Sequence, residues 1–122
     1  MMYIINHSNG SKILDIDANC IKDHRTGNKL FDIDGNCIKD HRTGNKLLDI
    51  DHNNVKDHRN GSRLLDIDGN CIKNHRNGNK LYDIDENCVK EHKTGKRLYD
   101  FSGVTFLSYP YLIAALHALQ VL

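Results

Sequence analysis

The sequence lacks an excess of charge of either sign. Its 122 residues contain 17 lysine and arginine residues against 16 aspartate and glutamate residues, which leaves a formal net charge of +1. No run of one sign stands out, so the composition points neither to nucleic acid nor to an acidic partner. The length suffices for one domain with a modest core and excludes two ordinary domains.

The first residues, MMYIINHSNG, contain no basic segment followed by an apolar stretch, so we expect no secretory signal. We therefore expect a cytoplasmic protein whose thiols stay reduced. The four cysteines are Cys20, Cys37, Cys71 and Cys88. Their spacing does not demand disulfides.

The usual marks of an enzyme are missing as well. The sequence contains no glycine-rich phosphate loop, and no serine, cysteine or acidic residue stands in a turn of its own. Near-identical repeats seldom build an asymmetric catalytic site. We therefore predict neither catalysis nor a cofactor.

What the sequence does have is one unit of 17 residues repeated six times. The units are 3–19, 20–36, 37–53, 54–70, 71–87 and 88–104. Position 2 of each unit is Ile or Val, position 5 is His, position 8 is Gly and position 13 is Asp. Positions 11, 12 and 14 are apolar throughout. Six copies without an insertion indicate a repeat protein.

The turn residues predict that each unit is a β-hairpin. Arg25-Thr26-Gly27 suits a three-residue loop with a left-handed glycine, and Asp34-Gly35 suits a two-residue type I′ turn. The strands between them are residues 19–24 and 28–33. Both turns imply that position 2 lies opposite position 12 on either side. The prediction is an antiparallel meander of about twelve strands.

The register divides the side chains of a unit between two faces. Ile21, Phe31 and Ile33 lie on the expected core face. Asp23 lies opposite Lys29 at the rim of that face and predicts a cross-strand ion pair. The other face is mixed and carries Cys20, Lys22, His24, Asn28, Leu30 and Asp32.

The repeat stops after Gly103, and residues 101–122 contain no Asp, Glu, Lys or Arg. Ser108 offers a helix cap and Pro110 a first-turn proline, so we predict an apolar helix over 110–122. Twelve untilted strands would close around a radius of roughly 9 Å, which a helix ~10–12 Å across can fill. We therefore predict a closed barrel plugged by its own helix, within one domain. The alternative is membrane contact through 104–122.

A barrel also needs a stagger between its strands. A register that repeats identically supplies none, so bulges or the closing pair of strands would have to provide it.

The turn Asp32-Ile33-Asp34-Gly35-Asn36, the run Leu98-Tyr99-Asp100 and the short period resemble bacterial β-flower hairpin-repeat proteins over residues 3–104. That resemblance implies small hairpins arranged around an axis and brings no known active site. Twelve strands around an apolar C-terminal helix are also similar to the tubby-like and scramblase-related barrels. That similarity is one of architecture, because no tubby signature is present.

Two patterns that resemble metal-binding motifs lack the spacing that metal binding requires. The turn at Asp32 has glycine at its fourth position and no Glu at the twelfth, unlike an EF-hand. In a strand, the Cys and His of CxxxH lie ~13 Å apart, so no single CxxxH can hold zinc. The candidate metal ligands that remain are a ring of repeat histidines, His24, His41, His58, His75 and His92. The structural alternative is that each histidine pairs with Asn at position 9.

The function predicted from these patterns is a non-enzymatic binding or assembly module. Its contacts would come from the arginines of the loops, Arg25, Arg42, Arg59 and Arg76. One alternative is a metal- or pH-responsive protein that uses the histidine ring. The other is a membrane-associated protein. The partner classes open at this point are another protein and a second copy of the chain, and we expect no nucleic acid.

Overall fold

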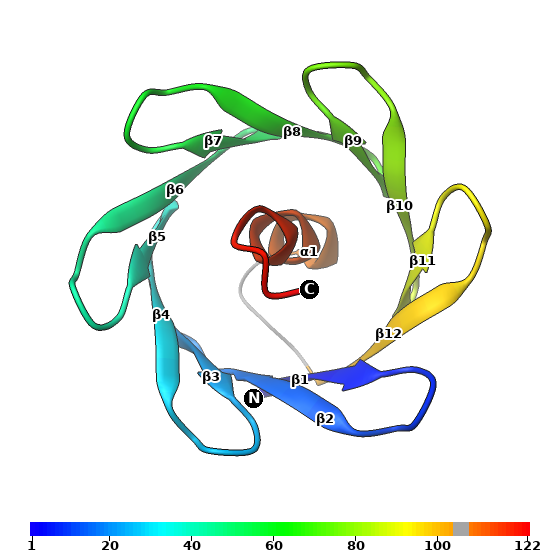
Figure 1. Cartoon of the computed structure of the whole chain (residues 1–122), viewed down its shortest axis with the longest axis horizontal. Helices are drawn as coiled ribbons and strands as arrows, with labels where there is room; N and C mark the ends of the chain where they lie inside the picture. The colour runs from blue at the N-terminus through cyan, green and yellow to red at the C-terminus, as the bar shows by residue number, and fades with distance from the viewer. Residues whose placement is uncertain (104–107) are drawn as a thin grey trace.

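The computed structural model describes residues 1–103 and 108–122. Twelve antiparallel strands form a closed barrel in which each strand pairs with its sequence neighbours and β1 pairs with β12 (Figure 1). The helix α1 (Tyr109–Ala118) stands inside the ring of strands. The predicted fold class is therefore confirmed. The strands are β1 (Met2–Asn6), β2 (Lys12–Ile16), β3 (Cys20–Asp23), β4 (Lys29–Asp34), β5 (Cys37–Asp40), β6 (Lys46–Asp51), β7 (Asn54–Asp57), β8 (Arg63–Asp68), β9 (Cys71–Asn74), β10 (Lys80–Asp85), β11 (Cys88–Glu91) and β12 (Arg97–Ser102).

The loop within each hairpin is closed by backbone hydrogen bonds around a left-handed glycine. In the second unit Asp23 N–H donates to the Asn28 carbonyl at 2.9 Å, and Gly27 N–H donates to the Asp23 carbonyl at 2.8 Å. Gly27 has φ +75°, as the sequence predicted. The loop therefore includes His24, and the strand before it is shorter than predicted.

The pairing between units differs from the prediction. Within a hairpin Ile21 lies opposite Phe31, as expected. Between hairpins, however, Phe31 lies opposite Asp40 and Ile33 opposite Ile38, so position 2 faces position 14 there. The reason is that the two turn residues are Gly35 and Asn36 rather than Asp34 and Gly35. Among these two, Gly35 alone has positive φ, as in a type II′ turn rather than type I′.

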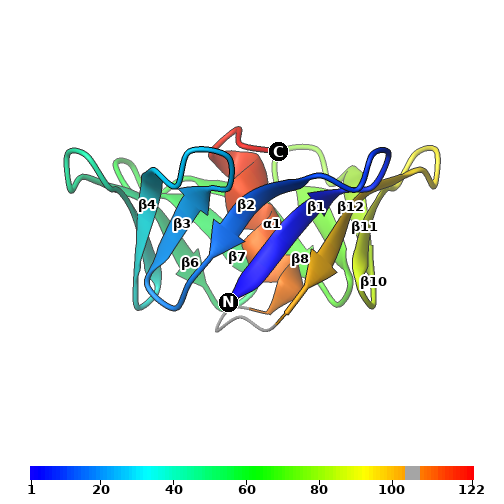
Figure 2. The ribbon, with the colours of Figure 1, turned by 90° about the horizontal axis from the view of Figure 1, so that it is seen from below.

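This unequal pairing supplies the stagger that the barrel needs. From Ile21 to Phe31 to Asp40 the register moves by two residues per unit. A stagger of about one residue per strand, ~3.3 Å against a spacing of ~4.8 Å, tilts the strands by about 35°. Figure 2 shows the resulting slope of the strands. A bulge between Ile21 and Lys22, repeated in the other hairpins, interrupts the ladder near each loop.

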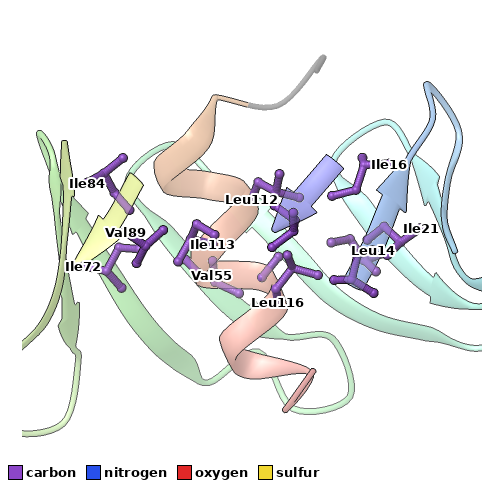
Figure 3. Packing of buried hydrophobic residues seen from close by; sticks show 14 of the residues in the cluster. Leu14, Ile16, Ile21, Val55, Ile72, Ile84, Val89, Leu112, Ile113 and Leu116 are labelled. Carbon is purple, nitrogen blue, oxygen red and sulfur yellow. The ribbon is translucent and has the colours of Figure 1, made fainter. Parts of the chain in front are cut away.

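The core lies inside the barrel and contains no buried polar residue among those described. Its strand layer is formed by position 2, whose side chains are all 0% exposed: Ile4, Ile21, Ile38, Val55, Ile72 and Val89. These side chains surround Leu112, Ile113 and Leu116 of α1, which are also fully buried (Figure 3). The predicted core face and the predicted plug are therefore confirmed.

Helix α1 ends at Ala118, four residues before the predicted end. Gln120 adopts φ +62°, and Val121 N–H donates to the Leu116 carbonyl at 3.0 Å. This left-handed cap with a six-to-one hydrogen bond is a Schellman motif, which terminates a helix. The described helix is too short to span a membrane. Residues 104–107, part of the segment proposed for membrane contact, lie outside the described residues.

The barrel closes at a seam where the first and last strands meet. Tyr3 lies opposite Ser102, and Met2 is fully buried at the start of β1. Gly103 follows with φ +98°, and a Cβ at this position would lie 2.3 Å from the Met1 carbonyl oxygen. The seam therefore requires glycine for two reasons, the backbone angle and the close approach of the chain.

Candidate functional site at the loop crown

The two ends of the barrel differ in shape. At one end the six hairpin loops splay outward like petals (Figure 1). We call this end the crown and define it as residues 7–12, 24–29, 41–46, 58–63, 75–80 and 92–97. The short turns between hairpins form the opposite end, which we call the base. The N-terminus lies at the base and the C-terminus at the crown (Figure 2).

The repeat histidines lie at the foot of the crown loops, and each pairs with an aspartate of the preceding hairpin. His24 Nδ1 lies 2.7 Å from Asp15, and His41 Nδ1 lies 2.8 Å from Asp32. The pattern closes around the ring, because His7 pairs with Asp100 at 2.8 Å. The remaining pairs are His58–Asp49, His75–Asp66 and His92–Asp83.

The predicted pairing of histidine with Asn at position 9 is therefore wrong. The cause lies in the backbone of the neighbouring hairpin: His24 N–H donates to the Ile13 carbonyl at 3.1 Å. This bond draws the imidazole across the boundary between hairpins and places it beside Asp15. Every His–Asp pair thus joins two hairpins rather than closing one loop.

The histidines reach no metal geometry within this chain. Among the described residues, no three His, Cys, Asp or Glu side chains are grouped to hold an ion. Burial raises the pKa of the Cys37 and Cys71 thiols, which opposes the thiolate form that metals bind. The metal ring remains a prediction, and it needs ligands from a second chain.

The crown also carries exposed cations, and none of them takes part in a salt bridge within the described residues. The four predicted loop arginines, Arg25, Arg42, Arg59 and Arg76, belong to this set. Sequence reasoning missed its other members, which are Lys12, Lys29, Lys46, Arg63, Lys80, Lys93, Lys96 and Arg97. Position 10 is Lys or Arg in every unit, and this regularity was the signal for most of them.

The carboxylates near the crown loops are occupied by the loops themselves. Asp23 accepts a hydrogen bond from the Thr26 hydroxyl at 2.9 Å. Asp57 accepts one from the Arg59 backbone N–H at 2.9 Å, and Glu91 accepts one from the Thr94 hydroxyl, also at 2.9 Å. These acids therefore hold the loops in shape and leave the neighbouring side-chain cations without an ionic partner.

The base has a different arrangement, because four of its aspartates form ion pairs with lysines. The described ion pairs between lysine and aspartate, at 2.8 to 3.0 Å, are Lys39–Asp34, Lys56–Asp51, Lys73–Asp68 and Lys90–Asp85. Hydrogen bonds from these lysines hold the pKa values of Asp34, Asp51 and Asp68 below the usual range of Asp.

The predicted Asp23–Lys29 ion pair does not form, because the bulge brings Lys22 rather than Asp23 opposite Lys29. The lysine of position 3 pairs instead with the aspartate of position 15 in the preceding unit. Four aspartates of the base are thus paired with lysines, whereas the crown cations make no salt bridge within the described residues.

One polar contact breaks the symmetry of the crown. Tyr82 OH and His117 Nδ1 of α1 are hydrogen-bonded at 2.7 Å, and the two rings meet edge to face with centroids 5.1 Å apart. Burial lowers the pKa of His117 and raises that of Tyr82, so both are neutral at pH 7. The hairpin that contains β10 is therefore tied to the plug by a polar contact.

No family model, curated protein or solved structure matches this chain. The resemblance to β-flower hairpin-repeat proteins therefore remains a prediction. Function must be argued from the crown itself.

Proposed function

We propose that this protein is a non-catalytic binding module that engages an acidic protein surface through its crown. The observation that carries the proposal is the unbalanced charge of that end. Arg25, Arg42, Arg59 and Arg76 are exposed on successive loops and make no salt bridge with any residue that the structure describes, whereas four aspartates of the base are paired with lysines. A ring of unpaired cations attracts an anionic partner and steers its approach.

The arrangement of these cations favours a broad acidic surface over a nucleic acid. A nucleic-acid duplex presents a line of phosphates and suits a basic stripe or groove. Here the cations stand on six loops that splay outward around an axis (Figure 1). A broad surface can contact several loops at once, and such multiple contacts add to the affinity.

The proposal is tested by removing four positive charges either from the crown loops or from position 3 of the repeat. In the first variant Arg25, Arg42, Arg59 and Arg76 become serine. The matched control removes the same number of charges from position 3 of the repeat. In it, glutamine replaces Lys22, Lys39, Lys56 and Lys73. Immobilised poly-L-glutamate serves as the acidic probe, with duplex DNA and acidic-lipid vesicles as comparison probes.

We expect the intact protein to bind poly-L-glutamate at low salt and to lose this binding as salt screens the charges. The arginine variant should lose binding at low salt, while the lysine control keeps most of it. If both variants lose binding to poly-L-glutamate equally, the binding depends only on net charge, and the crown is not the site. Preference for DNA or vesicles over poly-L-glutamate would reject the acidic protein partner.

The second candidate is a metal- or proton-responsive protein, and the six His–Asp pairs favour it. Each pair joins two hairpins, so protonation of a histidine acts on a contact between units. A cytoplasmic location and the absence of catalysis belong to the same proposal. Membrane association would require α1 to leave the core in which its apolar side chains are buried.

A further inference from the structure

A cleft of about 540 Å³ lies at the crown between the fifth and sixth hairpins. It is formed where β10 begins and β11 ends, and Tyr82 lies opposite Glu91 there. Its volume lies within the range of sites for small molecules. Lys80, Leu81, Tyr82, Glu91, His92 and Lys93 line it.

The polar lining of the cleft is suited to an anion. Lys80 and Lys93 are exposed and make no salt bridge in the described part of the chain. The single carboxylate of the lining, Glu91, already accepts a hydrogen bond from the Thr94 hydroxyl at 2.9 Å. Two lysines therefore line the cleft without a salt bridge to any residue that the structure describes.

His92 adds a third polar group. Its Nδ1 donates to Asp83 at 2.7 Å, since a carboxylate can only accept, and Nε2 is left for a ligand. The imidazole is thus oriented by its own carboxylate.

The apolar lining consists of Leu81 and Tyr82, both half-buried. The contact with His117 holds this ring in place, and no other position-12 residue makes a side-chain hydrogen bond to α1 in the described residues. The corresponding residues of four other hairpins are Leu14, Phe31, Leu48 and Leu65. Tyr82 therefore offers an aromatic ring fixed by a hydrogen bond to α1, which the Leu and Phe side chains at this position of those hairpins do not.

We propose that the cleft binds a small phosphate monoester with a ring-shaped body. Two lysines and an oriented imidazole match the charge and the oxygens of a phosphate dianion. The edge or face of Tyr82 packs against the ring of the ligand. The inference rests on the proposed function in one respect, the attraction of anions to the crown, and it names a small-molecule ligand in addition to the protein partner.

The repeat supplies a matched control for the experiment. Phenyl phosphate is titrated into the full chain by calorimetry, with Lys80→Ser as the test variant and Lys29→Ser as the control at the same repeat position in another hairpin. We expect Lys80→Ser to weaken binding roughly tenfold or more, because a charged hydrogen bond is lost. Lys29→Ser should leave the affinity unchanged. All variants should keep the thermal midpoint of the parent, because the altered lysines are exposed.

A second pair of measurements tests the aromatic wall. Tyr82→Leu installs the residue that the fourth hairpin has at this position. It should weaken phenyl phosphate severalfold and leave the affinity for inorganic phosphate unchanged.

Three results would overturn the inference: no saturable binding of phenyl phosphate, equal losses in Lys80→Ser and Lys29→Ser, or benzoate binding as tightly as phenyl phosphate. The arginine variant of the poly-L-glutamate test leaves this cleft intact, so the two proposals fail independently.

Discussion

The strands that form the wall of this barrel and the helix that plugs it differ in sequence: the wall repeats one pattern, and the plug contains no repeat. The wall consists of six hairpins with a glycine at the same position of each loop, and each carries a fully buried Ile or Val at position 2. The plug is one helix of 10 residues without internal repetition, and its closest strands are β6 to β9. Repetition thus builds the barrel wall, while a single non-repeated helix fills the barrel and makes its sides unequal.

The largest effect should follow from a cavity in the plug. Leu116→Ala removes a side chain that is 0% exposed at the centre of the core. We expect it to lower the free energy of unfolding by about 2–5 kcal/mol, measured by urea denaturation and far-UV circular dichroism. Leu47→Ala applies the same chemical change to a half-exposed position of the wall and should cost clearly less. Equal costs would mean that the helix is not the centre of the core.

The next-largest loss of stability is expected at the seam between β1 and β12, where the repeat ends. Gly103→Ala places a Cβ 2.3 Å from the Met1 carbonyl oxygen at a residue with φ +98°. We expect a loss of roughly 2–4 kcal/mol from the clash and the backbone strain together.

Gly35→Ala is the control for the seam, because its φ is +60° and an added Cβ meets nothing within 4 Å. It should cost about 1–2 kcal/mol, from backbone strain without a clash. Thermal unfolding of both variants compares the two sites. A larger loss for Gly35→Ala would contradict the seam as described.

The smallest expected effect is on the pH dependence of stability. It is measured by comparing His117 of the helix with His41 of a hairpin. Burial lowers the folded-state pKa of His117 below its ordinary value of 6.5. The unfolded chain therefore binds the proton first as pH falls, so the stability due to this group is complete above pH 6.5 and declines below it.

The measurement is the urea midpoint between pH 7.5 and 5. His117→Asn should flatten the decline on acidification, whereas His41→Asn on the wall should leave most of it in place. An unchanged slope in His117→Asn would assign the decline to other groups.

The repeating unit and much of the fold follow from the amino-acid sequence alone. Gly27 and its equivalents mark the loops, position 2 marks the core, and the uncharged tail marks the plug. These features were readable because turn chemistry and hydrophobic pattern act locally and recur six times. The register between hairpins was not readable, because Asp34-Gly35-Asn36 allows two positions of the turn and the barrel selects the one that gives stagger.

Only the tertiary structure decided where charge lies and which residues meet. Along the chain acids and bases alternate, so no run of one sign is visible. Folding a 17-residue period into a ring places position 10 of every unit at the crown and position 15 at the base, which separates the charges in space. The same closure brings His7 to Asp100 and Tyr82 to His117. Such contacts depend on distances between elements far apart in the chain, which no local pattern contains.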